Sequence, residues 1–163
     1  MEGSNAWIII YNMQDWQQLV IIGYILLGLL GTYIGYRKSR FEKDYYRSFV
    51  GIFAIYGAFV WADIILFGIF WAIFGLVAII LKSWIFFLLS LSLFWLVRGL
   101  GETIYWFNQQ FSTFDPTLIH KRGIFKIFDN DKYTSRFMMQ VFSQCITVAS
   151  ALATIYLIKI WLS

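Results

Sequence analysis

The chain has 163 residues, of which 60% are apolar and 13% are charged, and its formal net charge is +4 at pH 7. A soluble globular domain usually carries about 25% charged residues, so this composition excludes an ordinary water-soluble domain. Ten of the 13 Lys and Arg residues fall in two short segments, 37–48 and 112–136. This grouping indicates loop charge beside a membrane rather than a surface that binds nucleic acid.

Four apolar segments follow one another along the chain, at residues 19–36, 49–81, 83–111 and 137–162. About 20 apolar residues are enough to span the hydrocarbon core of a bilayer as a helix. The segments are apolar on every side instead of alternating with a period of two, so they predict helices and not barrel strands. We therefore expect an all-α integral membrane protein, a single domain with four transmembrane helices in one bundle.

The first apolar segment follows an amphipathic stretch, residues 6–18, which either lies along the headgroups or extends the first span. Within the span, Gly28, Gly31 and Gly35 place small residues on one helix face. Small residues let helix backbones approach closely. This face therefore predicts helix packing, either within the chain or against a second copy of it.

The second apolar segment, residues 49–81, is too short to hold two spans and the turn between them. We expect one long, tilted helix that continues past the hydrocarbon, and the alternative is a span with a break near Gly68 or Gly75. The segment meets the third one at residues 81–83. The two segments should therefore form a long central helical hairpin.

Three charged residues, Asp63, Arg98 and Glu102, lie inside the apolar segments of this hairpin. A charge at the bilayer centre costs about 2.5–3.5 kcal/mol on insertion scales, so each one needs a partner or a wet cavity. Asp63 and Arg98 are equally far from the expected turn, and Glu102 follows Arg98 by one helical turn. We predict an intramembrane charge network that fixes the helix register, carries an ion or proton, or contacts a partner subunit.

The last apolar segment carries polar residues at spacings of three and four, which places them on one helix face. This polar stripe consists of Gln140, Ser143, Thr147, Ser150 and Thr154. Its hydroxyl groups favour close helix packing, with hydrogen bonds back to carbonyl groups of the preceding turn. The alternative is a polar path that lines a cavity.

The two basic segments predict the orientation of the chain, because Lys and Arg are enriched in cytoplasmic loops. Loops 37–48 and 112–136 are then cytoplasmic, and both termini lie outside. A plasma (inner) membrane is the default location. The only cysteine, Cys145, lies in an apolar run, so the chain forms no intramolecular disulfide.

No motif in the sequence predicts catalysis, a metal or a cofactor. His120 is the only histidine, which excludes a haem with two axial histidines and a His-rich metal site. The Ser, Cys and His residues form no recognisable pair of nucleophile and base. An enzyme is therefore the least favoured class of protein.

The sequence favours a small non-enzymatic membrane protein, either an accessory or assembly subunit or a self-associating module. Its expected partners are the lipid bilayer and either a second copy of the chain or a larger membrane protein. The alternative is a small ion- or proton-coupled transporter or channel subunit that uses Asp63, Arg98 and Glu102. The sequence alone does not choose between these functions.

Overall fold

The structure, a computed structural model, describes residues 13–41, 51–112 and 132–162. In chain order these residues form α2 (Asp15–Phe41), the 3-10 helix η1 (Gly51–Tyr56), α3 (Trp61–Ile80), α4 (Trp84–Gln110) and α5 (Lys132–Leu162). The four α-helices are each long and apolar enough to cross a membrane. Over these described residues, the chain is thus an all-helical membrane protein with four helices able to span a membrane, as the four apolar segments predict.

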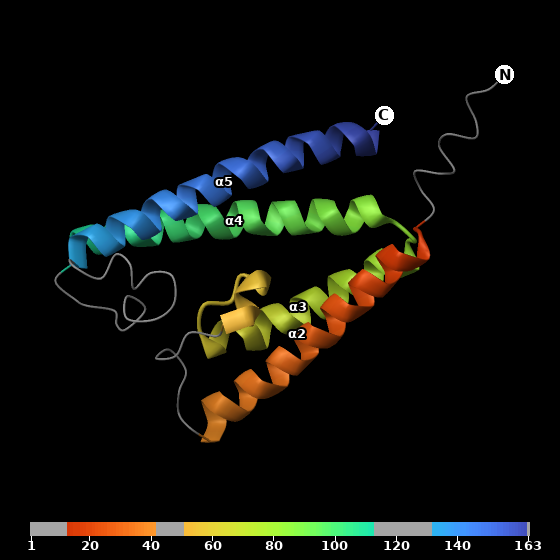
Figure 1. Cartoon of the computed structure of the whole chain (residues 1–163), viewed down its shortest axis with the longest axis horizontal. Coiled ribbons are helices and arrows are strands. Elements are labelled where there is room, and N and C mark those ends of the chain that lie inside the picture. Colours follow the sequence, from red (N-terminus) through yellow and green to blue (C-terminus); the bar gives the residue numbers. More distant parts are fainter. Residues whose placement is uncertain (1–12, 42–50, 113–131, 163) are drawn as a thin grey trace.

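The helices form two antiparallel pairs that are joined at one end (Figure 1). α2 packs along α3, and α4 packs along α5. The consecutive helices α3 and α4 approach each other closely at only a few places, and the two pairs diverge from the turn that joins them. The short helix η1 lies in the wedge between the pairs, near the start of α3.

The α3–α4 turn lies where the sequence places it, and local chemistry explains both sides of it. Lys82 follows α3 in the left-handed conformation, with φ of 49°, and its amide donates to the carbonyl of Ile79 at 3.0 Å. Ser83 then caps α4, because its Oγ accepts a hydrogen bond from the amide of Phe86 at 3.2 Å. α4 therefore begins within one residue of the predicted third segment.

α2 is longer than the predicted first span at both ends. It begins at Asp15, so residues 15–18 of the amphipathic stretch extend the helix, whereas residues 6–12 lie outside the described residues. At the other end it continues to Phe41, and Lys38 and Arg40 form part of its last turn. Basic side chains there interact favourably with the carbonyl end of the helix dipole, which explains the extension into the basic segment.

α5 also begins earlier than expected, at Lys132 instead of residue 137. Arg136, which the sequence analysis placed in the cytoplasmic loop 112–136, is fully buried against the end of α4. Its Nη1 donates hydrogen bonds to the carbonyl oxygens of Gln109 at 2.6 Å and Ser112 at 3.0 Å. Arg136 thus binds carbonyl oxygens at and just beyond the end of α4, where the regular helical hydrogen bonds stop.

The second apolar segment is not the single long helix that we expected. Its described part divides into η1, a turn at Gly57, and α3, which begins only at Trp61. The break does not lie near Gly68 or Gly75, because both residues are inside α3. Gly57 has φ of 74°, a backbone conformation that a right-handed helix cannot include, and this explains the break.

Glycines bring the backbones of α2 and α3 into contact. A Cβ added at Gly68 would lie 2.5 Å from the carbonyl oxygen of Gly28. At Gly31 and Gly35, an added Cβ would lie 2.8 Å and 2.7 Å from side-chain atoms of Ile64. The glycine face of α2 is therefore filled from within the chain, and a second copy cannot pack on it while α3 is in place.

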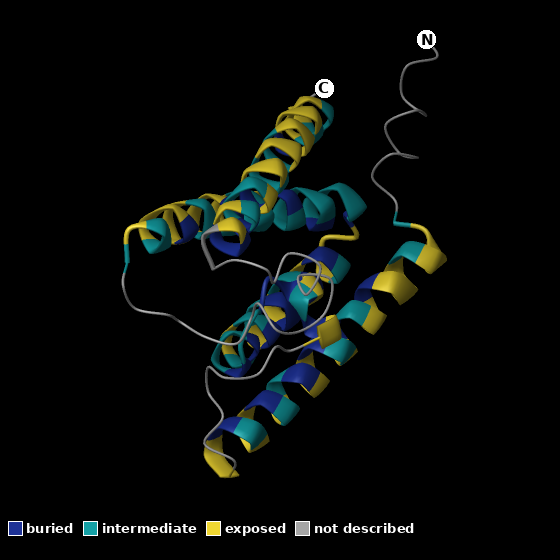
Figure 2. Ribbon diagram, turned by 60° about the vertical axis from the view of Figure 1, so that its left-hand side comes forward, coloured by how far each residue is buried: buried dark blue, intermediate teal, exposed yellow. Residues whose placement is uncertain are grey.

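The buried core is largely aromatic and lies where α2, α3 and η1 meet the inner side of α4. Trp71 of α3 is fully buried, and its ring centre lies 5.5 Å from that of Tyr24 and 5.0 Å from that of Phe94. Both contacts have the edge-to-face geometry that aromatic rings prefer. Figure 2 shows that buried residues are concentrated in this region, whereas α4 is mainly of intermediate burial and α5 has many exposed residues.

Candidate functional site

The structure brings Asp63, Arg98 and Glu102 into one cluster of charges. Arg98 extends from α4, and its Nη2 lies 3.1 Å from Oδ2 of Asp63 on α3. The same nitrogen lies 2.9 Å from Oε1 of Glu102, one turn further along α4. Asp63 and Arg98 therefore lie at the same level of the α3–α4 hairpin.

The cluster also binds the backbone of the broken segment that precedes α3. Nε of Arg98 donates a hydrogen bond to the carbonyl oxygen of Gly57 at 3.0 Å. Oδ2 of Asp63 accepts a hydrogen bond from the amide of Phe59 at 3.2 Å. Asp63 lies in the first turn of α3, where a carboxylate also interacts favourably with the amide end of the helix dipole. The two side chains thus bind backbone groups outside a regular helix.

Glu102 is held from two directions. Its Oε1 faces Arg98, and its Oε2 accepts a hydrogen bond from Nε1 of Trp106 at 3.0 Å. Trp106 is itself only 2% exposed. Because its tryptophan partner is packed, Glu102 has little freedom to turn away from Arg98.

Two phenylalanine rings flank the guanidinium group of Arg98. Its Cζ lies 5.1 Å from the ring centre of Phe59 and 5.5 Å from that of Phe67. Such cation–π contacts stabilise a guanidinium by about 0.5–2 kcal/mol. Arg98 also lines a groove of about 260 Å³, whose other lining residues are uncharged: Phe67, Phe94, Val97 and Gly101.

Tyrosines and glycines that the sequence analysis did not single out complete the site. Oη of Tyr24 donates to the carbonyl oxygen of Ile55 at 3.1 Å, and Oη of Tyr56 donates to that of Tyr24 at 2.5 Å. Gly51 and Gly57 stand on either side of this segment, and both have positive φ, 60° and 74°. This pair of glycines is a sequence signal at the break, but glycine is frequent in spanning helices, so the pair does not locate the break by itself.

The polar stripe of α5 bonds partly within its own helix. Oγ of Ser143 donates to the carbonyl oxygen of Met139 at 2.9 Å, and Oγ1 of Thr147 donates to that of Ser143 at 2.8 Å. Gly99 of α4 leaves room for Thr147, because an added Cβ there would lie 3.2 Å from its amide nitrogen. This part of the stripe serves close packing of α4 and α5.

Other members of the stripe reach across to α4. Oγ1 of Thr154 donates a hydrogen bond to Oγ of Ser92 at 3.0 Å, and both residues are buried. The side-chain nitrogen Nε2 of Gln110 donates a hydrogen bond to Oε1 of Gln140. The stripe thus contacts α4 through residues other than Arg98 and Glu102.

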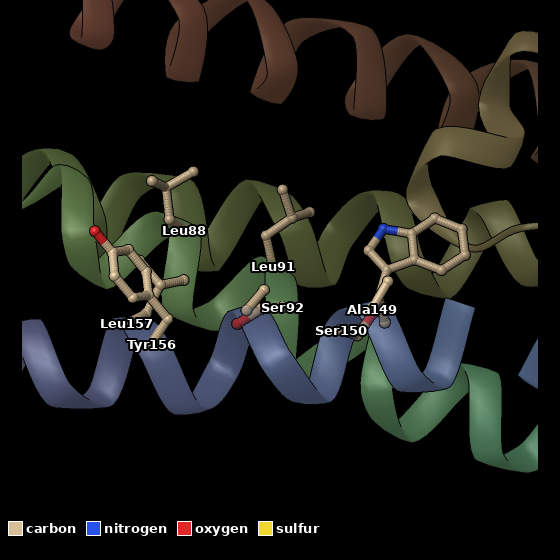
Figure 3. Close-up of a pocket in the computed structure, with 9 residues that line it drawn as sticks. Leu88, Leu91, Ser92, Ala149, Ser150, Tyr156 and Leu157 are labelled. Carbon is tan, nitrogen blue, oxygen red and sulfur yellow. The ribbon is translucent and has the colours of Figure 1, made fainter. Parts of the chain in front are cut away.

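Ser150, the remaining member of the stripe, lines an apolar groove between α4 and α5 (Figure 3). This groove has a volume of about 460 Å³, and Leu88, Leu91 and Trp95 line it from α4. Tyr156 and Leu157 line it from α5, and none of its lining residues is charged. It can therefore accommodate an apolar group.

The part of the chain that the structure describes contains no group of three or more His, Cys, Asp or Glu residues suited to hold a metal ion. The single histidine, His120, lies outside the described residues. Asp63, Arg98 and Glu102 include two carboxylates of opposite charge to the guanidinium between them. The interactions that the structure shows within the cluster are ion pairs and hydrogen bonds.

Comparison with known proteins identifies no family model, no curated protein and no solved structure that matches this chain. The function must therefore be argued from the residues and their geometry.

Proposed function

We propose that the chain is a small non-enzymatic membrane protein that serves as an accessory or assembly subunit of a larger membrane protein. The observation that carries this proposal is the way in which Arg98 is used. Its Nη2 pairs with Asp63 and Glu102, and its Nε holds the carbonyl oxygen of Gly57. A charged side chain that binds the backbone of its own chain stabilises the fold, whereas the charged groups of a transport site must exchange their partners.

The packing of α2 supports a different protein as the partner rather than a second copy bound through the glycines. Gly28, Gly31 and Gly35 are buried against α3 and η1. A self-associating module would have to use another face. The exposed apolar residues of α5, such as Leu152 and Ile155 with 65% and 66% exposure, provide one.

Photo-crosslinking in the membrane tests this proposal. A photo-reactive amino acid at Leu152 or Ile155 should give one adduct of defined mass, larger than the 19.2 kDa chain and containing a second protein. The same amino acid at Trp71, which is fully buried, serves as the control and should give no adduct with another chain. An adduct of two identical chains would favour the self-associating module. Absence of any adduct, together with a monomer in mild detergent, would contradict the proposal.

A second candidate function is ion- or proton-coupled transport, with the chain as a transporter or channel subunit. Two carboxylates face one guanidinium, so the cluster has an excess of negative charge when all three groups are ionised. The groove beside Arg98 provides an approach to it. Ionisable groups in spanning helices often mark such pathways.

Flux measurements in reconstituted vesicles separate the two functions. The accessory role predicts that Asp63→Asn leaves any ion or proton flux unchanged. The matched control is Asp15→Asn at the exposed start of α2, which should also leave the flux unchanged. A flux that Asp63→Asn abolishes and Asp15→Asn preserves would establish transport instead. Thermal unfolding of both variants in detergent shows that the folded protein is being compared.

A further inference from the structure

Residues 51–60 enter the space between the helix pairs and leave it again on the same side. Phe53 of η1 packs against Gly31 of α2, and Tyr56 packs against Gly28, which lies one turn closer to the N-terminus of α2. The chain then reverses at Gly57, and the carbonyl oxygen of Trp61 lies beside Gly35. The segment thus passes Gly31 of α2 as it enters, reaches its deepest point beside Gly28 and returns to the level of Gly35.

This excursion reaches well inside the level at which α3 begins. Gly28, which contacts Tyr56, also faces Gly68 of α3. Gly68 lies about two turns, or roughly 10 Å, beyond the first residue of α3. Because α3 has 20 residues and spans about 30 Å, η1 lies alongside the part of α3 that crosses the membrane.

Backbone that is not in a regular helix is tolerated at membrane depth only where protein or trapped water satisfies its polar groups. Protein groups do so here. The amide of Gly57 donates to Ala54 at 2.9 Å, and its carbonyl accepts from Arg98 at 3.0 Å. The amide of Phe59 donates to Asp63, and the carbonyl of Ile55 accepts from the hydroxyl of Tyr24. Two of these four partners are Asp63 and Arg98, charged residues whose burial in an apolar segment costs free energy.

We propose that residues 51–60 form a re-entrant segment, which enters the membrane from the side where α3 begins and returns there without crossing. Asp63 and Arg98 replace water for its backbone, and Glu102 orients the guanidinium. The hydrogen bonds of Arg98 leave from two different nitrogens in fixed directions, a geometry that lysine cannot reproduce.

Cysteine labelling in vesicles tests the depth of this segment. Cys145→Ser removes the only native thiol and supplies a background without cysteine. In that background, single cysteines replace Ile55, near the deepest point, and Phe41, at the end of α2; these residues are 44% and 72% exposed. A charged maleimide reacts with the thiolate form of cysteine, and an apolar environment disfavours that form. Ile55→Cys should therefore react at least ten times more slowly than Phe41→Cys, and equal rates would overturn the proposal.

A cysteine at Ile52, which is 65% exposed near the entry point, tests the direction of approach. It should react only from the side that labels Phe41→Cys. Lys82→Cys, in the α3–α4 turn, reports the opposite side. Labelling of Ile52→Cys from the Lys82 side would mean that the segment crosses the membrane, which would overturn the proposal.

The role of Arg98 is tested in the Ile55→Cys background. Arg98→Ala should raise the labelling rate of Ile55→Cys severalfold, because the segment loses its anchor. Ile104→Ala, which changes an α4 residue that is 61% exposed and does not line the groove beside Arg98, should leave the rate unchanged. An unchanged rate in Arg98→Ala would overturn the anchoring role. If Arg98→Ala does not yield folded protein, Arg98→Lys keeps the positive charge but loses the hydrogen bond from Nε to Gly57, and an unchanged labelling rate in that variant would again overturn the anchoring role.

Discussion

Arg98 combines in one side chain an ion pair, a backbone hydrogen bond and contacts with two aromatic rings. Burying an arginine among apolar helices costs about 2.5–3.5 kcal/mol on insertion scales. A buried ion pair by itself does little more than offset that cost. The additional contacts with Gly57 and with Phe59 explain why the cluster can be retained without a role in transport.

Gly57 is the residue on which the local geometry depends most directly. Gly57→Ala should destabilise the protein by about 1–3 kcal/mol, because alanine is strained at φ of 74°. Its Cβ would also lie 2.5 Å from a ring carbon of Phe94. Thermal unfolding in detergent measures the effect.

Gly101 provides the control for this substitution. It lies within α4, and a Cβ added there meets nothing within 4 Å. Gly101→Ala should leave stability unchanged or raise it by up to about 1 kcal/mol, because alanine favours a helix. A Gly57→Ala variant as stable as Gly101→Ala would show that the turn does not require glycine.

At the scale of single elements, the two helix pairs use different means of packing. α2 and α3 are brought together by glycines, so their backbones touch. α4 and α5 are joined partly by hydroxyl groups, such as those of Ser92 and Thr154. Both means of packing are usual in membrane proteins. Apolar side chains are as well solvated by lipid as by protein, so close packing and hydrogen bonds drive the association of helices.

Gly68→Ala tests the glycine contact. The new methyl group would lie 2.5 Å from the carbonyl oxygen of Gly28, and a backbone atom cannot move aside as a side chain can. α2 and α3 must then separate, and we expect a loss of about 1–3 kcal/mol in the free energy of unfolding. Thermal or denaturant unfolding in detergent provides the measurement.

The matched control for Gly68→Ala is Gly23→Ala on the partner helix α2. An added Cβ at Gly23 meets nothing within 4 Å, so this change should not lower stability. Equal destabilisation by the two variants would argue against close contact of the α2 and α3 backbones.

At the scale of the whole molecule, the start of α2, the α3–α4 turn and the end of α5 lie at one end, as Figure 1 shows. The basic residues of the last turn of α2 and the start of α5 lie at the other end. Together with the bias of Lys and Arg toward the cytoplasm, this arrangement predicts an outside location for both termini.

Reporter tags test this orientation. Tags on the two termini should both report the outside of the cell, and Lys82→Cys in the Cys145→Ser background should react with an impermeant maleimide added outside. Phe41→Cys should react only after the membrane is opened. Tags that report opposite sides would contradict the four-span topology, whereas both tags inside would reverse the predicted orientation.

The sequence by itself determined the protein class, the number of apolar helices able to span a membrane and the turn at residues 81–83, because segment length and apolarity are local properties. Equal distance from that turn also sufficed to place Asp63 level with Arg98. Only the tertiary structure decided that the segment before α3 breaks at Gly57 and folds between the helix pairs. An apolar sequence fits a long helix and a re-entrant segment equally well, and the choice depends on side chains of α2 and α4 that are distant along the chain.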